Sequence, residues 1–176
     1  MISTFKYPNH VVNYAKFSSK CEAHYIVSKY RYEPTTVLAM SKIDPLPYQL
    51  EDFLDLLTEM DSEEHMHALL SYETGLGKTI VAGLVIKELL LNKPDANIIV
   101  IATPMGVQQW KEELEQKFGI TGVKIESMDT LKMRLDLLKR EEPIWDLAVV
   151  DELHRATPGN RRYELISWVR DHSKNF

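Results

Sequence analysis

Long apolar runs are what this 176-residue sequence most clearly lacks. No stretch approaches the roughly 18 apolar residues that a membrane helix needs, and the N-terminus has no apolar signal-peptide core. We therefore expect no membrane partner. The default expectation is a cytoplasmic location, with a nucleoid or nuclear one undetermined.

The sequence also has only one cysteine and no excess of basic charge. The lone cysteine, Cys21, excludes an intrachain disulfide, which fits a reducing compartment. The net charge of -5 argues against a strongly basic nucleic-acid binder. Low-complexity tracts and internal repeats are absent, and a content of 44% hydrophobic and 27% charged residues is typical of one globular unit with a core.

Charge and tyrosine are distributed unevenly along the chain. Residues 1–43 carry a net +4 and five of the eight tyrosines, so the remainder carries -9. This shift predicts a basic, tyrosine-rich segment at residues 1–44 and a domain at residues 45–176. Residues 24–40 predict short strands in the first segment. That segment could stack bases and pair with phosphates, or form a small sheet with a solvated face; both interpretations stay open.

Strands and helices alternate in the predicted domain. Apolar residues at helical spacing predict helices at residues 50–60, 78–92, 107–118, 129–140 and 161–171. Short apolar runs predict strands at residues 68–70, 98–102, 123–126 and 147–150. The alternation predicts an α/β fold, a parallel sheet covered by helices on both faces, with ligands at the carboxyl ends of the strands. Trp110, Trp145 and Trp168 lie in apolar patterns and are interpreted as core anchors.

A glycine-containing loop joins the first predicted strand to an apolar helix. Gly75 and Gly77 permit backbone N–H groups to wrap a phosphate at a helix N-terminus, Lys78 can reach the terminal phosphates, and Thr79 can ligate magnesium. Tyr72 stands where the consensus has its first glycine. The alternative is an ordinary turn, but the order of strand, loop and helix favours ATP binding. The predicted nucleotide-binding residues of the loop are Glu73, Thr74, Gly75, Leu76, Gly77, Lys78 and Thr79.

Two carboxylates follow the last predicted strand. Asp151 and Glu152 come directly after residues 147–150, at the strand end where the loop is also expected. One carboxylate can hold a magnesium ion and the other can orient water for attack on a phosphate. Alone, this pair would more often be a solvated turn. Together with the loop, it predicts a site for ATP and a magnesium ion.

These residues resemble superfamily 2 helicases and translocases, and within them the Swi/Snf-type branch, over about residues 45–162. Gln49, in Pro47-Tyr48-Gln49, is similar to the glutamine that contacts adenine in that family. Thr103, Pro104 and Gln109 resemble motif Ia, which contacts the nucleic-acid backbone. The sequence from Asp151 to Arg155 resembles motif II, in which His154 would link hydrolysis to movement.

The resemblance implies a RecA-like P-loop domain, the first lobe of a motor that couples ATP hydrolysis to movement on nucleic acid, expected to be double-stranded DNA. It assigns catalytic roles to Lys78, Asp151, Glu152 and His154. Motif III is expected after Phe176, and a second lobe, in the same or another chain, would supply arginines worth about 10³ to 10⁵ in rate. We therefore expect the chain alone to bind ATP and to hydrolyse it very slowly.

Two departures from the family pattern stand in the sequence: Tyr72, and Leu153 in place of the usual alanine. Neither removes a ligand of phosphate or metal. Two other functions stay open: a non-catalytic nucleotide-binding or interaction module from a truncated gene, and a motor fragment of an RNA helicase or restriction enzyme.

Overall fold

The computed structural model describes residues 34–61, 65–73 and 75–176. Residues Thr35–Phe176 form one compact unit. At its start, helix α2 (Pro34–Ala39) occupies part of the segment that was predicted to form short strands. Proline suits the first position of a helix, because its fixed φ is helical and its missing N–H is not needed there. The rest of the predicted strands, and most of the 1–44 segment to which the base-stacking interpretation applies, lie outside the described residues.

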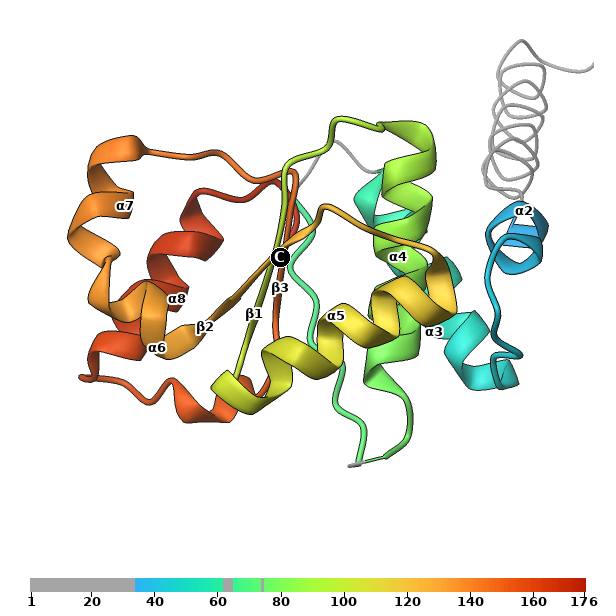
Figure 1. Ribbon diagram of the computed structural model, residues 1–176, viewed down its shortest axis with the longest axis horizontal. Helices are drawn as coiled ribbons and strands as arrows, with labels where there is room; N and C mark the ends of the chain where they lie inside the picture. The colour runs from blue at the N-terminus through green and yellow to red at the C-terminus, as the bar shows by residue number, and fades with distance from the viewer. Residues whose placement is uncertain (1–33, 62–64, 74) are drawn as a thin grey trace, which may run out of the picture. The chain divides into compact units, whose positions relative to one another are not determined.

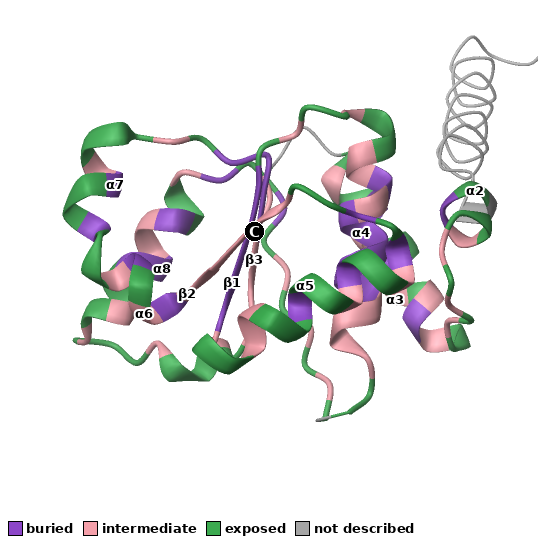
Figure 2. Cartoon of the chain, viewed as in Figure 1, coloured by how far each residue is buried: buried purple, intermediate pink, exposed green. Residues whose placement is uncertain are grey.

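A parallel sheet forms the centre of the unit. Its strands are β1 (Ile98–Ala102), β2 (Lys124–Ser127) and β3 (Leu147–Val150), in the order β2-β1-β3. Val100 of β1 is in register with Ile125 on one side and Val149 on the other. All five residues of β1 are buried (Figure 2), because a central strand covered on both faces has no solvent side. The parallel sheet and the strands predicted at residues 98–102, 123–126 and 147–150 are confirmed here, with β2 shifted by one residue.

Helices cover both faces of the sheet (Figure 1). One face carries α4 (Lys78–Asn92) and α5 (Pro104–Phe118), with α3 (Pro47–Met60) packed beside α4. The other carries α6 (Met128–Met133), α7 (Leu135–Glu141) and α8 (Arg161–Asp171). The bounds of α4 and α8 match the predicted ones. None of the described helices is both long and apolar enough to cross a membrane.

Two predicted elements differ in the structure. Residues 68–70 are not a buried strand: Leu69 is 73% exposed. Ala68 N–H donates to the Phe176 carbonyl at 2.9 Å and Phe176 N–H to the Met66 carbonyl at 2.8 Å, so the stretch meets a single residue and not a strand. The single helix predicted at residues 129–140 is two helices that meet at Arg134, whose φ of -101° and ψ of 10° interrupt the helix.

Asp146 joins three segments at the amino end of β3. Its carboxylate accepts hydrogen bonds from Lys93 at 2.8 Å, from Lys174 at 2.9 Å and from the backbone N–H of Asn97 at 2.9 Å. Burial by itself raises the pKa of Asp146, but these hydrogen bonds outweigh it and hold the pKa well below its usual range. The cluster therefore fixes the end of the sheet that lies away from Asp151.

Candidate nucleotide site

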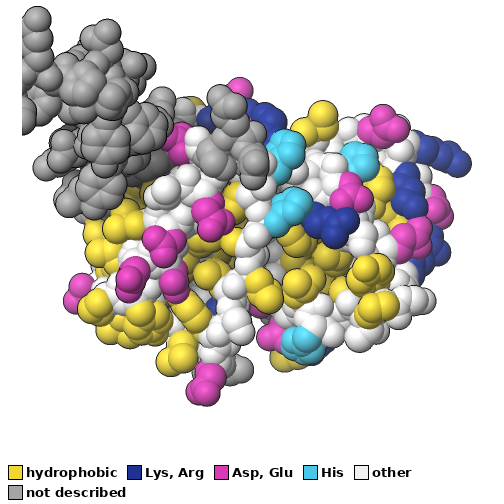
Figure 3. Space-filling view, turned by 180° about the vertical axis from the view of Figure 1, so that it is seen from behind, with side chains coloured by type: hydrophobic (Ala, Val, Ile, Leu, Met, Phe, Trp, Pro, Cys, Tyr) yellow, Lys and Arg dark blue, Asp and Glu magenta, His cyan; other side chains and the backbone are white. Residues whose placement is uncertain are grey.

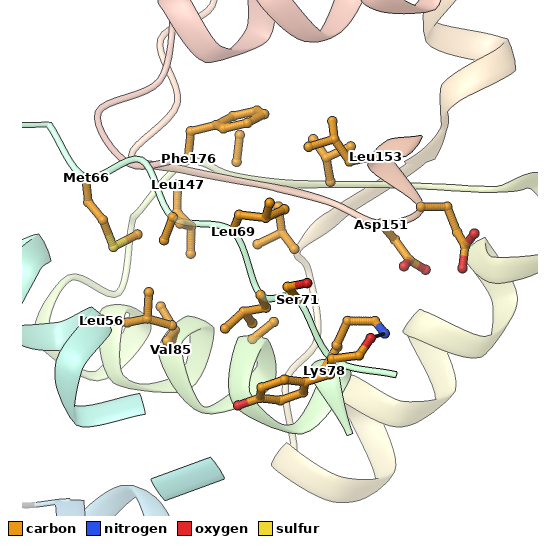
Figure 4. A pocket seen from close by; sticks show the side chains of 18 of the residues that line it. Leu56, Met66, Leu69, Ser71, Lys78, Val85, Leu147, Asp151, Leu153 and Phe176 are labelled. Carbon is orange, nitrogen blue, oxygen red and sulfur yellow. Dashed lines mark hydrogen bonds between the residues drawn. The ribbon is translucent and has the colours of Figure 1, made fainter. Parts of the chain in front are cut away.

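The carboxyl end of the sheet brings the predicted site residues together. Asp151 follows β3, and Lys78 begins α4. Lys78, Asp151, Glu152 and His154 all line one cavity of about 420 Å³. In Figure 4 the side chains of Lys78 and Asp151 extend into the same part of this cavity. Its other end, toward Met66 and Phe176, is apolar.

The loop before α4 depends on glycine. Gly75 and Gly77 have φ of 88° and 82°, in the left-handed region that side chains disfavour. A Cβ on Gly77 would lie 2.3 Å from Nε2 of Gln49, whereas one on Gly75 would meet nothing within 4 Å. Gly77 thus permits close packing on α3, and Gly75 leaves open space where a ligand can approach. Thr74 lies outside the described residues; Glu73 and Leu76 are exposed.

Lys78 folds back over its own loop. Its ammonium donates to the carbonyl oxygen of Tyr72 at 2.7 Å and to that of Glu73 at 3.3 Å. An ammonium has three donors on a flexible stem, so these contacts are exchangeable for phosphate oxygens. Thr79 is the next residue of α4; it is half-buried and is not part of the cavity wall.

Gln49 of α3 is buried and contacts the loop through its side-chain amide. Its Oε1 accepts from the backbone N–H of Leu46 at 2.9 Å, which caps α3, and its Nε2 donates to the Leu76 carbonyl at 3.0 Å. The Tyr48 hydroxyl donates to the same carbonyl at 3.0 Å. Both ends of the Gln49 amide are therefore engaged, and its contact with adenine stays a prediction.

Tyr72, the departure from the loop consensus, anchors the start of the loop. Its hydroxyl donates to the carboxylate of Asp52 on α3. Its ring meets the ring of Tyr48 edge-on, with centroids 5.6 Å apart. The residue that replaces glycine thus adds a second attachment between the loop and α3.

Asp151 is held by backbone and side chain. Its N–H donates to the Ile101 carbonyl at 2.8 Å, and its Oδ2 accepts from the indole Nε1 of Trp110 at 3.1 Å. The apolar pattern around Trp110 predicts core packing alone, because its contact with Asp151 joins residues that lie 41 positions apart in the chain. Glu152 has a φ of 56°, and its Oε2 lies 3.4 Å from Nε2 of His154, which is exposed.

The predicted nucleic-acid residues lie at the start of α5, outside the cavity wall. The Thr103 hydroxyl caps the helix by accepting from the Gly106 N–H at 3.0 Å, and Pro104 is the first helical residue. Gln109 is exposed, and its amide donates to Glu113 at 2.9 Å. These residues neighbour the cavity through Gly106, where a Cβ would lie 3.8 Å from Oδ2 of Asp151.

A family model for the res subunit of type III restriction enzymes matches residues 42–134, more than half of the chain and including the loop. The chain belongs to this family. The match and the relatives below confirm the likeness to superfamily 2 helicases of the Swi/Snf type.

Two curated relatives and one solved structure resemble the chain. An uncharacterized ATP-dependent helicase of Bacillus subtilis, YqhH, is 31% identical over 143 residues, 73% of this chain and 25% of the relative. The RNA polymerase-associated protein RapA of Sodalis glossinidius is 23% identical over 185 residues, 89% of this chain and 19% of the relative. The chain thus spans a quarter or less of these helicase-family relatives.

The solved structure is the Sulfolobus solfataricus SWI2/SNF2 ATPase core in complex with double-stranded DNA. It superposes with a TM-score of 0.65 at 18% identity, covering 77% of this chain and 31% of that one. This likeness shows the fold and confirms that the domain is RecA-like.

Proposed function

We propose that this chain is the ATP-binding lobe of an ATP-dependent translocase acting on double-stranded DNA. The observation that carries the proposal is the single cavity that Lys78, Asp151 and Glu152 line at the N-terminus of α4. The open approach to Gly75 and the exchangeable contacts of Lys78 fit a phosphate chain.

Each residue of the site has a proposed role. Lys78 binds the terminal phosphates, while Thr79 and Asp151 hold a magnesium ion. When bound, this ion neutralises charge on the phosphates and lowers the barrier to their transfer. Glu152 orients the attacking water and accepts its proton. His154, whose Nε2 lies 3.4 Å from Oε2 of Glu152, links ATP hydrolysis to movement of the protein on DNA.

The helicase relatives and the fold support a DNA substrate for the assembled protein. Contact with the DNA backbone is assigned to Thr103, Pro104 and Gln109 at the start of α5. Figure 3 shows acidic side chains gathered over α3, where Glu51, Asp55 and Glu59 are exposed. Such a surface repels phosphates, so DNA is not expected to lie against α3.

A second RecA-like lobe is proposed as the partner that completes catalysis, consistent with the short span of this chain against its relatives. Arginines from that lobe would stabilise the transferring phosphate, so the chain alone is expected to turn over very slowly. Glu152→Gln should leave nucleotide binding intact and abolish turnover of the assembled protein. Unchanged turnover would show that the role given to Glu152 is wrong.

Retention of labelled ATP on a filter, with magnesium present, tests the ATP-binding proposal. The wild-type chain should retain ATP, and Lys78→Ala should lose most of that retention because the phosphates lose their only proposed side-chain cation. Lys111→Ala, an exposed lysine of α5, is the matched control and should bind as wild type. Equal retention by wild type and Lys78→Ala would overturn the proposal.

A further inference from the structure

Trp110 lies on α5 with only 5% of its surface exposed and directs its indole N–H at the carboxylate of Asp151, 3.1 Å away. Core packing alone does not require this contact. The buried indole N–H of Trp145 has no hydrogen-bond partner among the described residues, so a tryptophan can anchor this core without one.

The contact fixes which way the Asp151 carboxylate faces. An indole N–H only donates, so a carboxylate oxygen must face it; here that oxygen is Oδ2, and Oδ1 remains available to another ligand. The backbone of Asp151 is already tied to Ile101. Partners of this kind set the orientation of carboxylates that ligate metals, and their loss typically lowers metal affinity about 10- to 100-fold.

We propose that Trp110 is a positioning residue for the metal-ligating Asp151, and that α5 controls through it the affinity of the site for magnesium. This inference rests on the proposed function. The same helix carries the proposed DNA-backbone residues at its start. A Cβ on Gly106 would lie 3.1 Å from the Thr103 hydroxyl and 3.8 Å from Oδ2 of Asp151, so the first turn of α5 lies beside the carboxylate. A shift of α5 on DNA binding would therefore move the indole and the metal ligand together.

Trp110→Phe keeps a large aromatic ring and removes the N–H, so it isolates the contact. ATP binding by the 176-residue chain would be measured across magnesium concentrations and in EDTA. The variant should need about 10-fold more magnesium for half-maximal binding, with affinity in EDTA unchanged. Trp145→Phe is the control: it removes an indole N–H that has no partner among the described residues, so its magnesium requirement for ATP binding should equal that of wild type. An unchanged magnesium requirement in Trp110→Phe would overturn the proposal.

Two further measurements separate positioning from packing. In an Asp151→Ala background, Trp110→Phe should cause no further change in the magnesium requirement, because the group it orients is gone; an added tenfold effect there would refute the role. In the wild-type chain, adding magnesium and ATP should shift the indole N–H resonance of Trp110 and leave that of Trp145 in place. A static Trp110 resonance in protein that binds ATP would equally overturn the inference. Failure of wild type to bind ATP at any magnesium concentration would instead count against the proposed function.

Discussion

Gly77 packs so closely on Gln49 that a Cβ at position 77 would lie 2.3 Å from Nε2 of the glutamine. The backbone of the loop at Gly77 therefore lies directly against the Gln49 side chain of helix α3. Gln49 also donates to the Leu76 carbonyl, so it holds the loop at two adjacent residues. The shape of the loop thus depends on α3 as well as on its own glycines.

Gly77→Ala should displace the loop and abolish ATP binding. The added Cβ meets the buried amide of Gln49, and the φ of 82° adds about 1 kcal/mol or more of strain. Gly159→Ala is the control: its φ is 86°, but a Cβ there meets nothing within 4 Å. It should lose stability through strain alone and bind ATP as wild type. Filter binding and thermal unfolding together check both; normal ATP binding by Gly77→Ala would contradict the packing argument.

Gln49→Glu should separate the two roles of the glutamine. A glutamate keeps an acceptor for the Leu46 N–H at the start of α3, where negative charge is favourable. It loses the donor to Leu76 and places a carboxylate beside that carbonyl. We expect the helix content to be retained and ATP affinity to fall about tenfold, given about 1 to 2 kcal/mol for the lost bond. Circular dichroism and ATP titration measure the two effects, and Gln108→Glu on α5 serves as the control.

Sequence predicts best those helices and strands whose burial can be inferred from their own apolar residues. Residues 98–102 are apolar and largely β-branched, and β1 is buried on both faces over the same residues. Residues 78–92 are apolar nearly all round and are followed at once by Lys93 and Pro94, and α4 begins and ends within these bounds.

The elements that sequence misses depend on partners elsewhere in the chain. Met128, Leu131, Leu135 and Leu138 keep helical spacing across Arg134, so their pattern hides the break between α6 and α7. Leu69 is apolar yet exposed, because no strand of the described chain lies against it. The candidate site likewise combines features that local sequence predicts with features that depend on residues distant in the chain. Local motifs predict Lys78, Asp151 and Glu152 as site residues, whereas the contact between Trp110 and Asp151 depends on the fold.

Asp146→Asn should destabilise the fold by about 1 to 3 kcal/mol near neutral pH, because the two lysine contacts lose their charge partner. The folded pKa of Asp146 lies below its unfolded value of about 3.9. The contribution of ionised Asp146 to the free energy of unfolding is therefore complete above about pH 5 and declines as the pH falls below about 4. The stability difference between wild type and variant should shrink in that acid range. Urea unfolding across pH measures it, and a difference that grew in acid would contradict the assignment.

The control for this pH dependence is Asp136→Asn. Asp136 pairs with Arg161 at 2.8 Å, but its side chain is 77% exposed, so solvent screens the pair. The stability of this variant should differ from that of wild type by less than about 1 kcal/mol at any pH.

Glu152→Gly should stabilise the fold while removing the proposed proton acceptor. The left-handed φ of 56° at Glu152 costs a non-glycine residue about 1 to 2 kcal/mol, and glycine recovers this less about 0.5 to 1 kcal/mol of added unfolded-state freedom. Glu142→Gly is the matched control, because Glu142 also has a left-handed φ, of 43°, and lies at the end of α7, away from the cavity wall. Glu142→Gly should gain similar stability and leave turnover of the assembled protein unchanged, whereas Glu152→Gly should gain stability and lose turnover. A lower unfolding temperature for Glu152→Gly together with a higher one for Glu142→Gly would contradict this prediction, because it would show that the Glu152 side chain stabilises the fold by more than its backbone strain costs.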